Sequence, residues 1–429
     1  MRKKVPGRKP TGGVRSFLSK LGPGLITGAA DDDPSGIGTY SIAGAQLGYS
    51  CLWIAWFSFP LMAAIQLICA RLGMVSGRGL AGLLRERYGP WALWPACFLL
   101  VVANVVNIGA DLGAMAASTA MVTGLPSYYF TPLYPVIMVC LMAWCSYHLI
   151  ARVFKWLTLV LFAYVIAAFL AHPNWDIVLR ATLIPQIQWS GAYATTLVAV
   201  LGTTISPYLF FWQATQEVEE DRDHGKVTLE QRKGATIQEK ENSKLDVTTG
   251  MLFSNVIMYF IILTTGATLH LHGKTHIATT AQAAEALRPL AGDAAYLLFT
   301  LGIIGTGMLC VPVLAGSIAY AIAEGAKWRN SLKYGPRQAP QFYAILAAAF
   351  LLGLVLNFLG LGVVAMLFWS AVINGVLAPP LIVLVVLMSS DRAVMGQHVS
   401  SPLLRALGWF TAAVMTVAAA AMFLTLRGA

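Results

Sequence analysis

The residues in this chain best suited to binding or catalysis are three consecutive aspartates. Asp31, Asp32 and Asp33 precede Pro34 and Ser35, and they are the only charged residues between positions 21 and 70. At the centre of a membrane helix each aspartate costs about 2.5 to 3.5 kcal/mol on insertion scales. The run therefore needs a stabilising partner, and a cation would serve.

The residues after the aspartates predict a break in the helix that carries them. Pro34 has no backbone N–H and disfavours helical geometry at Asp33, while Gly36 adds flexibility. Broken helices in membranes expose carbonyl oxygens that can hold ions. Carboxylates beside such carbonyls predict a cation site. Asp31 and Asp32 have an alternative role as caps of a helix at the water interface, which suits Asp33 less because about half an apolar span precedes it.

The composition indicates an integral membrane protein. Of 429 residues, 57% are hydrophobic and 11% are charged, whereas about 25% of residues are charged in a typical soluble protein. Apolar runs long enough to cross a ~30 Å hydrocarbon core recur along the chain. We therefore expect an all-α bundle whose surroundings are the lipid bilayer, with no nucleic-acid partner despite the net charge of +10 and no obligate protein partner.

Eleven spans are predicted, of which the first and sixth are broken. They cover residues 22–47, 51–74, 91–123, 131–150, 152–171, 193–217, 247–270, 294–323, 341–358, 362–388 and 405–426. With the N-terminus in the cytoplasm, 25 of the 29 lysines and arginines lie in cytoplasmic segments, as the positive-inside rule expects. We accordingly predict a multi-pass protein of the plasma (inner) membrane.

The third span carries a row of polar residues. Asn104, Asn107 and Asp111 are spaced so that they share one face of a helix. This spacing predicts that Asp111 faces the bundle interior or a water path. The alternative is a buried acid that only pairs with a basic residue.

The sixth span has a second irregular stretch, with Gly202, Thr203, Ser206 and Pro207 near its middle. It predicts either another break that exposes carbonyls or a simple proline kink whose hydroxyls bond their own backbone. Pro34 lies five spans earlier, as expected if spans one to five and six to ten are inverted repeats that meet at a midplane site.

The predicted organisation has three parts. Residues 1–20 form a basic cytoplasmic tail. Residues 21–390 form the ten-helix inverted-repeat core, which includes a cytoplasmic loop at 219–246. Residues 391–429 form a loop and an additional membrane helix.

Several later residues give weaker signals. Ser370 and Asn374 share a face of span ten, and Asn374 suits either ion coordination or interhelical hydrogen bonding. His270, His272 and His276, near the end of span seven, suit either a metal or a solvated interface.

Glycines and cysteines in the apolar runs suggest packing. Gly302, Gly305 and Gly307 predict close helix contacts in span eight. The six cysteines lie inside apolar runs without a CxxC pair, which favours buried free thiols over a zinc site or disulfides; they are Cys51, Cys69, Cys97, Cys140, Cys145 and Cys310.

Three stretches resemble the natural-resistance-associated macrophage protein (Nramp) family of divalent-metal transporters. They are GPGLITGAADDDPSG in span one, Ala110-Asp111 in span three and GTTISPYLFFWQ in span six. The resemblance covers the eleven-span layout. It implies a LeuT-like (APC-type) fold of five-plus-five inverted repeats, with a metal site between helices one and six.

The resemblance implies a ligand set that differs partly from the family's. The carboxylate ligand carries over to Asp33, while the asparagine ligand falls on Gly36 and the methionine ligand on Ser206. The family's remaining ligands are two carbonyls and a glutamine, which fall on Ala30, Thr203 and near Ser370. Because a thioether favours softer metals, its replacement by oxygen donors points to Mg²⁺ or Mn²⁺, as in the family's magnesium and manganese branch.

Proton coupling differs as well. The family's histidine position holds Tyr208 and its glutamate position holds Ala114, so Asp111, Asp31 and Asp32 are left as candidates for a proton path or gate. We therefore expect import without obligatory proton coupling.

The sequence thus predicts a secondary transporter, not an enzyme, that imports divalent cations by alternating access and has no resident cofactor. Asp33, Ala30, Thr203 and Ser206 are its expected metal site, with Ser35, Ser370 and Asn374 as further candidates and Pro34, Gly36 and Pro207 as the helix breaks. The alternatives are a proton-coupled Mn²⁺/Fe²⁺ importer, a sodium-coupled symporter of a small organic solute, and an intramembrane hydrolase that pairs Asp33 with Asp111.

Overall fold

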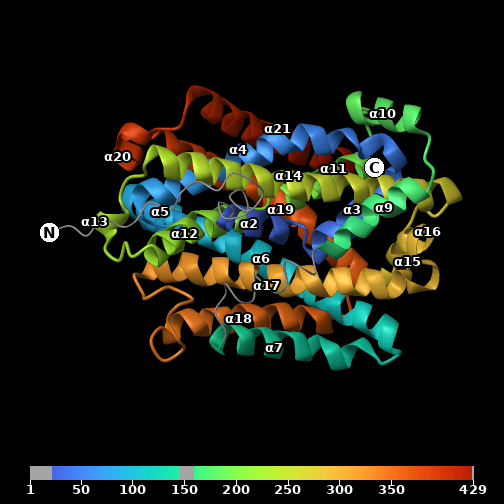
Figure 1. The fold of residues 1–429 in the computed structure, drawn as a ribbon, viewed down its shortest axis with the longest axis horizontal. Helices are drawn as coiled ribbons and strands as arrows, with labels where there is room; N and C mark the ends of the chain where they lie inside the picture. Colours follow the sequence, from blue (N-terminus) through green and yellow to red (C-terminus); the bar gives the residue numbers. More distant parts are fainter. Residues whose placement is uncertain (1–21, 145–158, 428–429) are drawn as a thin grey trace, which may run out of the picture.

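The computed structural model describes residues 22–144 and 159–427, and every regular element in these ranges is a helix (Figure 1). The predicted N-terminal tail lies outside the described residues. So do 145–150 of the predicted fourth span and 152–158 of the fifth.

Helices occupy the described parts of all eleven predicted spans. The helices of these spans are α2 (Pro23–Asp31), α3 (Pro34–Leu47), α4 (Trp53–Ser76), α6 (Pro90–Thr123), α7 (Phe130–Trp144), α9 (Phe162–Leu170), α11 (Gly191–Thr204), α12 (Pro207–Asp223), α14 (Ile237–Thr268), α17 (Ala295–Ala326), α18 (Pro340–Leu356), α19 (Val363–Ser390) and α21 (Pro402–Arg427). In the described ranges, nine segments are long and apolar enough to cross a membrane, and the broken first span and the shorter Leu159–Leu170 make up the rest.

The first span is broken where the sequence predicts it. Helix α2 ends at Asp31 and α3 begins at Pro34, with Asp33 extended between them (φ −70°, ψ 169°). Proline is suited to the first position of a helix, where no N–H donor is needed. Asp33 caps α3, because its carboxylate accepts a hydrogen bond from the Gly36 N–H at 2.5 Å.

The sixth span is also two helices rather than one kinked helix. Helix α11 ends at Thr204, and α12 begins at Pro207 after an extended Ser206 (φ −81°, ψ 132°). The Ser206 hydroxyl does not cap α12. It donates instead to the carbonyls of Gly202 and Thr203.

The half-helices pack in the way that an inverted repeat requires. Helix α3 lies against α14, and α12 lies against α4. These pairs join the second half of span one to span seven, and the second half of span six to span two, which are equivalent under a five-plus-five repeat. Both contacts depend on glycine: a Cβ atom on Gly44 would collide with the Ile262 carbonyl, and one on Gly73 would collide with the Ala214 carbonyl.

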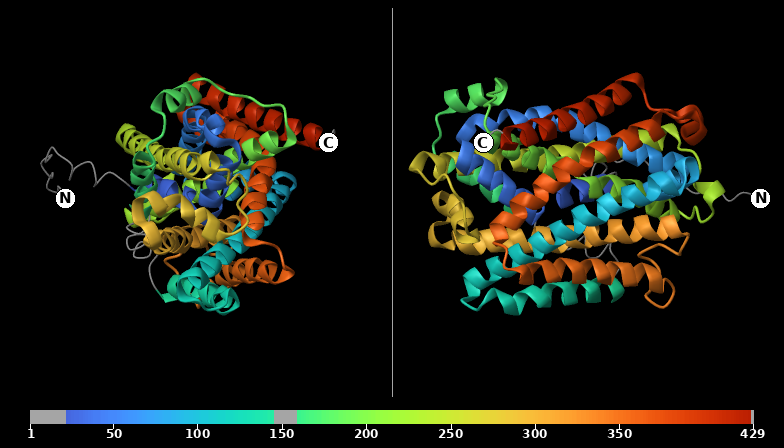
Figure 2. Two further views of the ribbon diagram at one scale, coloured as in Figure 1. Left: turned by 90° about the vertical axis from the view of Figure 1, so that its right-hand side faces the viewer. Right: turned by 180° about the vertical axis from the view of Figure 1, so that it is seen from behind.

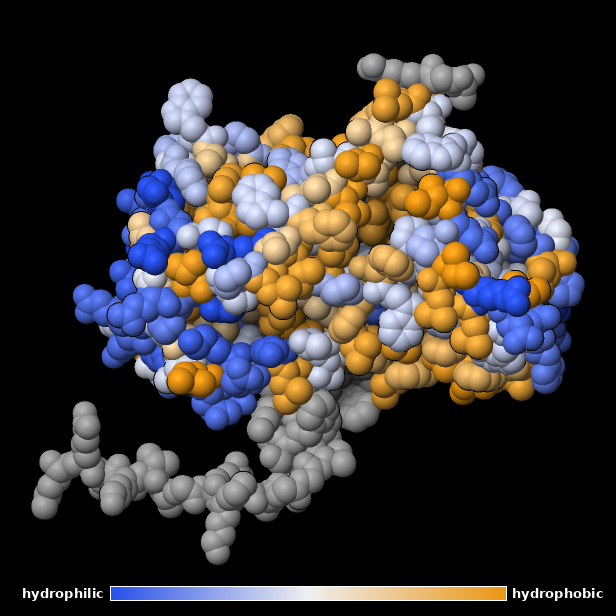
Figure 3. All heavy atoms as spheres, turned by 90° about the horizontal axis from the view of Figure 1, so that it is seen from above, coloured by the Kyte–Doolittle hydropathy of each residue, from blue (hydrophilic) through white to orange (hydrophobic). Residues whose placement is uncertain are grey.

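The long helices run between two polar ends. Figure 1 and the reverse view in Figure 2 place the short helices α5 (Leu80–Tyr88), α13 (Leu229–Arg232) and α20 (Arg392–Met395) at one end. The short helices α10 (Trp175–Leu183), α15 (Thr280–Ala284) and α16 (Arg288–Ala291) lie at the other. The face in Figure 3 has hydrophobic side chains between hydrophilic ends. Large apolar side chains such as Trp91 and Leu351 are exposed, as expected for a surface that contacts lipid.

Candidate metal site

The break in the first span holds a buried carboxylate. Asp33 is 1% exposed. Its Oδ1 accepts the Gly36 N–H, and its Oδ2 accepts a 2.7 Å hydrogen bond from the Asn107 side-chain amide of α6. The cap and the amide hold this carboxylate inside the bundle, as a predicted cation ligand would need to be.

Asp111 lies one helical turn beyond Asn107 and faces the same region. It is fully buried, as the shared face predicted. Its Oδ1 accepts the Ser35 N–H at 3.0 Å, while its Oδ2 has no hydrogen-bond partner. The alternative role, pairing with a basic residue, is not seen: the ion pairs found among the described residues do not include Asp111. Its role in a proton path or gate stays a prediction.

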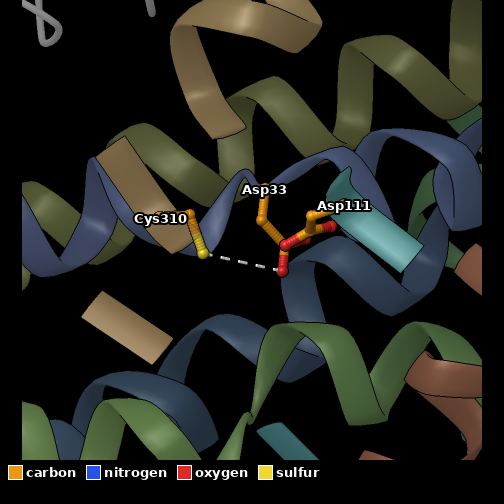
Figure 4. A group of neighbouring side chains, drawn as sticks. All are labelled: Asp33, Asp111 and Cys310. Atoms are coloured by element: carbon orange, nitrogen blue, oxygen red, sulfur yellow. Dashed lines mark hydrogen bonds between the residues drawn. The ribbon is translucent and has the colours of Figure 1, made fainter. Parts of the chain in front are cut away.

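Cys310 completes a group of three possible ligands. One ligand atom each from Asp33, Asp111 and Cys310 lies within 4.8 Å of the others, and all three side chains are buried. Figure 4 shows them pointing toward one another from the α2–α3 link, α6 and α17. The sequence predicted Cys310 only as a buried thiol and gave no sign of this contact.

The local signal for Cys310 is the glycine one turn before it. A Cβ on Gly307 would lie 3.3 Å from the Pro34 ring and would collide with Met115, so α17 approaches the break closely, as the glycines of span eight predicted. Residues three apart share a helix face. Cys310 is therefore brought to the break by the same close approach.

The predicted carbonyl ligands already have protein partners in this conformation. Tyr208 Oη donates to the Ala30 carbonyl at 2.9 Å, and Ser206 Oγ donates to the Thr203 carbonyl at 2.6 Å. Both carbonyls lie at the two breaks, as predicted. Coordination of an ion by them would replace or share these hydrogen bonds, so their ligand role stays a prediction.

The further ligand candidates lie around α19. Ser35 Oγ and Ser370 Oγ are 2.9 Å apart, and both hydroxyls donate to the Leu367 carbonyl. Asn374 is 1% exposed, and its Oδ1 has no hydrogen-bond partner. The structure thus connects Ser35 to Ser370 but shows no metal role for either.

Asp31 and Asp32 lie on the side of the break that faces α14. Ser254 Oγ lies 2.5 Å from Asp31 Oδ2 and 3.2 Å from Asp32 Oδ1. Both carboxylates are fully buried, so their alternative role as caps at the water interface is wrong. Ser254 was not among the predicted site residues, because no periodic pattern in the sequence marks it.

The three histidines near the end of the seventh span do not form a cluster. His270 Nδ1 lies 2.8 Å from the Ala45 carbonyl, and His272 and His276 are exposed. Among the described residues, the group of Asp33, Asp111 and Cys310 is the one cluster suited to a metal. The reading of these histidines as solvated interface residues fits the structure.

Comparisons with known proteins identify the family of this chain. Residues 24–425 match the family model described as natural resistance-associated macrophage protein-like. The divalent metal cation transporter MntH of Deinococcus radiodurans is 26% identical over 411 residues, which are 94% of this chain and 89% of that protein.

Two solved structures show the same fold. The manganese transporter of Eremococcus coleocola superimposes with a TM-score of 0.73 at 17% identity, over 97% of this chain and 88% of that chain. MhsT, solved in complex with L-phenylalanine, superimposes with a TM-score of 0.58 at 11% identity, over 98% of this chain and 99% of that chain. The predicted LeuT-like fold, with broken helices one and six, is confirmed. Because the family model matches nearly the whole length, this chain belongs to the natural resistance-associated macrophage protein (Nramp) family.

Proposed function

We propose that this protein imports divalent metal cations across the plasma (inner) membrane by alternating access. The observation that carries the proposal is the Asp33 carboxylate, buried at a helix break within 4.8 Å of Asp111. Two carboxylates out of water with no basic partner are costly, and a divalent cation offsets both charges at once. The relative named as a divalent metal cation transporter supports the same substrate class.

The placement of the basic residues and the membrane potential together support import as the direction of transport. Segments 71–87, 222–244 and 327–337 carry most of the basic residues that the structure describes, and the views in Figure 1 and Figure 2 place the helices within or beside them at one end. The positive-inside rule makes that end cytoplasmic. A divalent cation gains about 4.6 kcal/mol per 100 mV on entering a negative interior. Import therefore needs no proton, in line with Tyr208 and Ala114 at the family's titratable positions.

The metal ligands proposed from the sequence are Asp33 and the carbonyls of Ala30 and Thr203, with Ser206 as a polar neighbour. Oxygen donors of this kind suit Mn²⁺ and Mg²⁺. The relative of known structure is named a manganese transporter, so Mn²⁺ is the first ion to test and Mg²⁺ the second.

The test is uptake into proteoliposomes, with Asp33→Ala compared against Asp293→Ala. Asp293 is an exposed aspartate at the opposite end from the proposed cytoplasmic face, with its side chain 97% exposed. We expect Asp33→Ala to abolish uptake of Mn²⁺ while remaining folded, and Asp293→Ala to transport normally. Full transport by Asp33→Ala would refute the assignment.

Running the same assay with Mg²⁺, Fe²⁺ and Ca²⁺, each with and without a pH gradient, tests the metal and the coupling. Uptake independent of the pH gradient is expected. An increase when protons can enter with the metal would favour the proton-coupled alternative.

The alternative function as an intramembrane hydrolase is supported by one contact between side chains. The intramembrane hydrolase needs two aspartates together, and Asp33 and Asp111 are together. A hydrolase would cleave a membrane peptide without moving metal, whereas the proposed importer moves Mn²⁺ and leaves the peptide intact. An isotope screen of metals against amino acids separates the third possibility, a sodium-coupled symporter.

A further inference from the structure

One of the three buried side chains at the break, Cys310, differs in chemical type from the oxygen ligands predicted by sequence. Asp33 and Asp111 offer oxygen atoms, and Cys310 offers sulfur. Cys310 Sγ lies 3.8 Å from Asp33 Oδ2 and 3.6 Å from Tyr208 Oη. A buried cysteine that only packs is expected among apolar groups, but this thiol contacts two polar ones.

Asp111 provides an independent sign of a ligand. Its side chain is fully buried and its Oδ2 has no hydrogen-bond partner. Buried polar atoms are rarely left without a partner, because each loses the free energy of its contacts with water. An ion between Asp111 and Asp33 would satisfy this oxygen.

The distances suit a single ion after a small adjustment. Metal bonds to carboxylate oxygen and to sulfur are about 2.0–2.3 Å long, so two ligands at tetrahedral angles around one ion lie about 3.3–3.8 Å apart. Cys310 Sγ and Asp33 Oδ2 are 3.8 Å apart, and all three atoms lie within 4.8 Å of one another, so shifts of up to about 1 Å in the side-chain atoms bring the group into range. The carbonyls of Ala30 and Thr203 are bonded to Tyr208 and Ser206. Within the group of three side chains, Asp111 Oδ2 is the oxygen without a hydrogen bond.

We propose that Asp33, Asp111 and Cys310, the last as a thiolate after releasing its proton to water, form a mixed oxygen and sulfur site that holds the transported cation and favours ions that accept sulfur. This inference rests on the proposed function and deepens it, because it adds a sulfur ligand from α17 to the oxygen set. Sulfur ligands favour Cd²⁺, Zn²⁺ and Co²⁺ over Mg²⁺ and Ca²⁺. The site therefore admits softer divalent metals that an oxygen set alone would disfavour.

Cys310→Ser is the direct test, because it replaces sulfur with oxygen at nearly constant shape. Cys97→Ser is its matched control: Cys97 is also buried, and its Sγ lies 3.9 Å from the Ala321 carbonyl of the same α17, away from the acid group. Cys310→Ala is a second variant in case a buried serine disturbs folding.

The first readout is competition against Mn²⁺ uptake in proteoliposomes. We expect Cys310→Ser to raise the inhibition constant of Cd²⁺ about tenfold or more, with that of Mg²⁺ changed by less than about threefold. Cys97→Ser is expected to match the native protein. Equal Cd²⁺ inhibition in Cys310→Ser and the native protein would overturn the sulfur ligand.

The second readout does not depend on transport. Co²⁺ added to the purified native protein in detergent should produce a near-ultraviolet charge-transfer band from sulfur to metal, which Cys310→Ser and Cys310→Ala lose and Cys97→Ser keeps. A native protein without this band overturns the inference even if Mn²⁺ uptake is intact. A native protein that shows the band but moves no metal overturns the proposed function and leaves the site standing.

Discussion

At the break in helix one, three carboxylates lie inside the bundle and depend on groups from α6 and α14, whereas the break in helix six has hydroxyls that bond nearby backbone. Asp33 is held by Asn107, and Asp31 by Ser254. Ser206 donates to carbonyls three and four residues before it, and Thr204 to the carbonyl of Val200.

The two breaks share a backbone design, because each has an extended residue followed by proline at the start of the next half-helix. They differ in charge. A neutral hydroxyl is satisfied by its own turn, but a carboxylate needs donors or a cation from elsewhere. The contrast supports the proposal that helix one supplies the charged ligand, with helix six contributing neutral groups.

Among the variants that test this contrast, the largest expected loss of Mn²⁺ binding comes from removing the hydrogen-bond donor of Asp33. Asn107→Leu removes the amide that holds Asp33 and should weaken Mn²⁺ binding about 10- to 100-fold, as for other groups that orient a metal ligand. The measurement is the Mn²⁺ dissociation constant by isothermal titration calorimetry.

Asn104→Leu is the matched control. Asn104 lies one turn earlier on the same face, but its amide donates to the Leu314 carbonyl and to Ser317 on α17. It should lower thermal stability and leave the Mn²⁺ dissociation constant within about threefold of the native value. If both variants weaken Mn²⁺ binding equally, the effect comes from loosened packing. The proposed role of the helix-one break in binding the ion would then lose its support.

The smallest effect is expected at helix six. Ser206→Ala removes hydrogen bonds that are local to one turn, so the loss of stability should be below about 1 kcal/mol. Uptake of Mn²⁺ should stay within about threefold of the native rate, measured in proteoliposomes. A loss of tenfold or more would mean that the Ser206 hydroxyl coordinates the ion, and the contrast between the breaks would disappear.

Local sequence patterns were sufficient to predict the two helix breaks and the helix face that Asn107 and Asp111 share. Pro34 and Pro207 act through the geometry of their own neighbours, and Asn107 and Asp111 share a face because of helix periodicity. The eleven spans follow from the length of apolar runs.

The contacts of the site could not be obtained in this way. Cys310 and Asp33 are 277 positions apart, and Ser254 and Asp31 are 223 apart, so no local pattern relates them. The occupied carbonyls of Ala30 and Thr203 depend on the conformation of the two half-helices, which the sequence does not specify. Family resemblance supplied the predicted ligand positions, and Cys310 was not among them.

The most direct test of the central claim is an anomalous diffraction experiment on crystals grown with Mn²⁺, for the native protein and for Asp33→Asn. We predict a peak within about 2.2 Å of an Asp33 carboxylate oxygen in the native crystals, the usual length of such a metal bond, and no peak there in Asp33→Asn. Native crystals with no peak beside Asp33, or an unchanged peak in Asp33→Asn, would contradict the assignment of this helix break as the metal site.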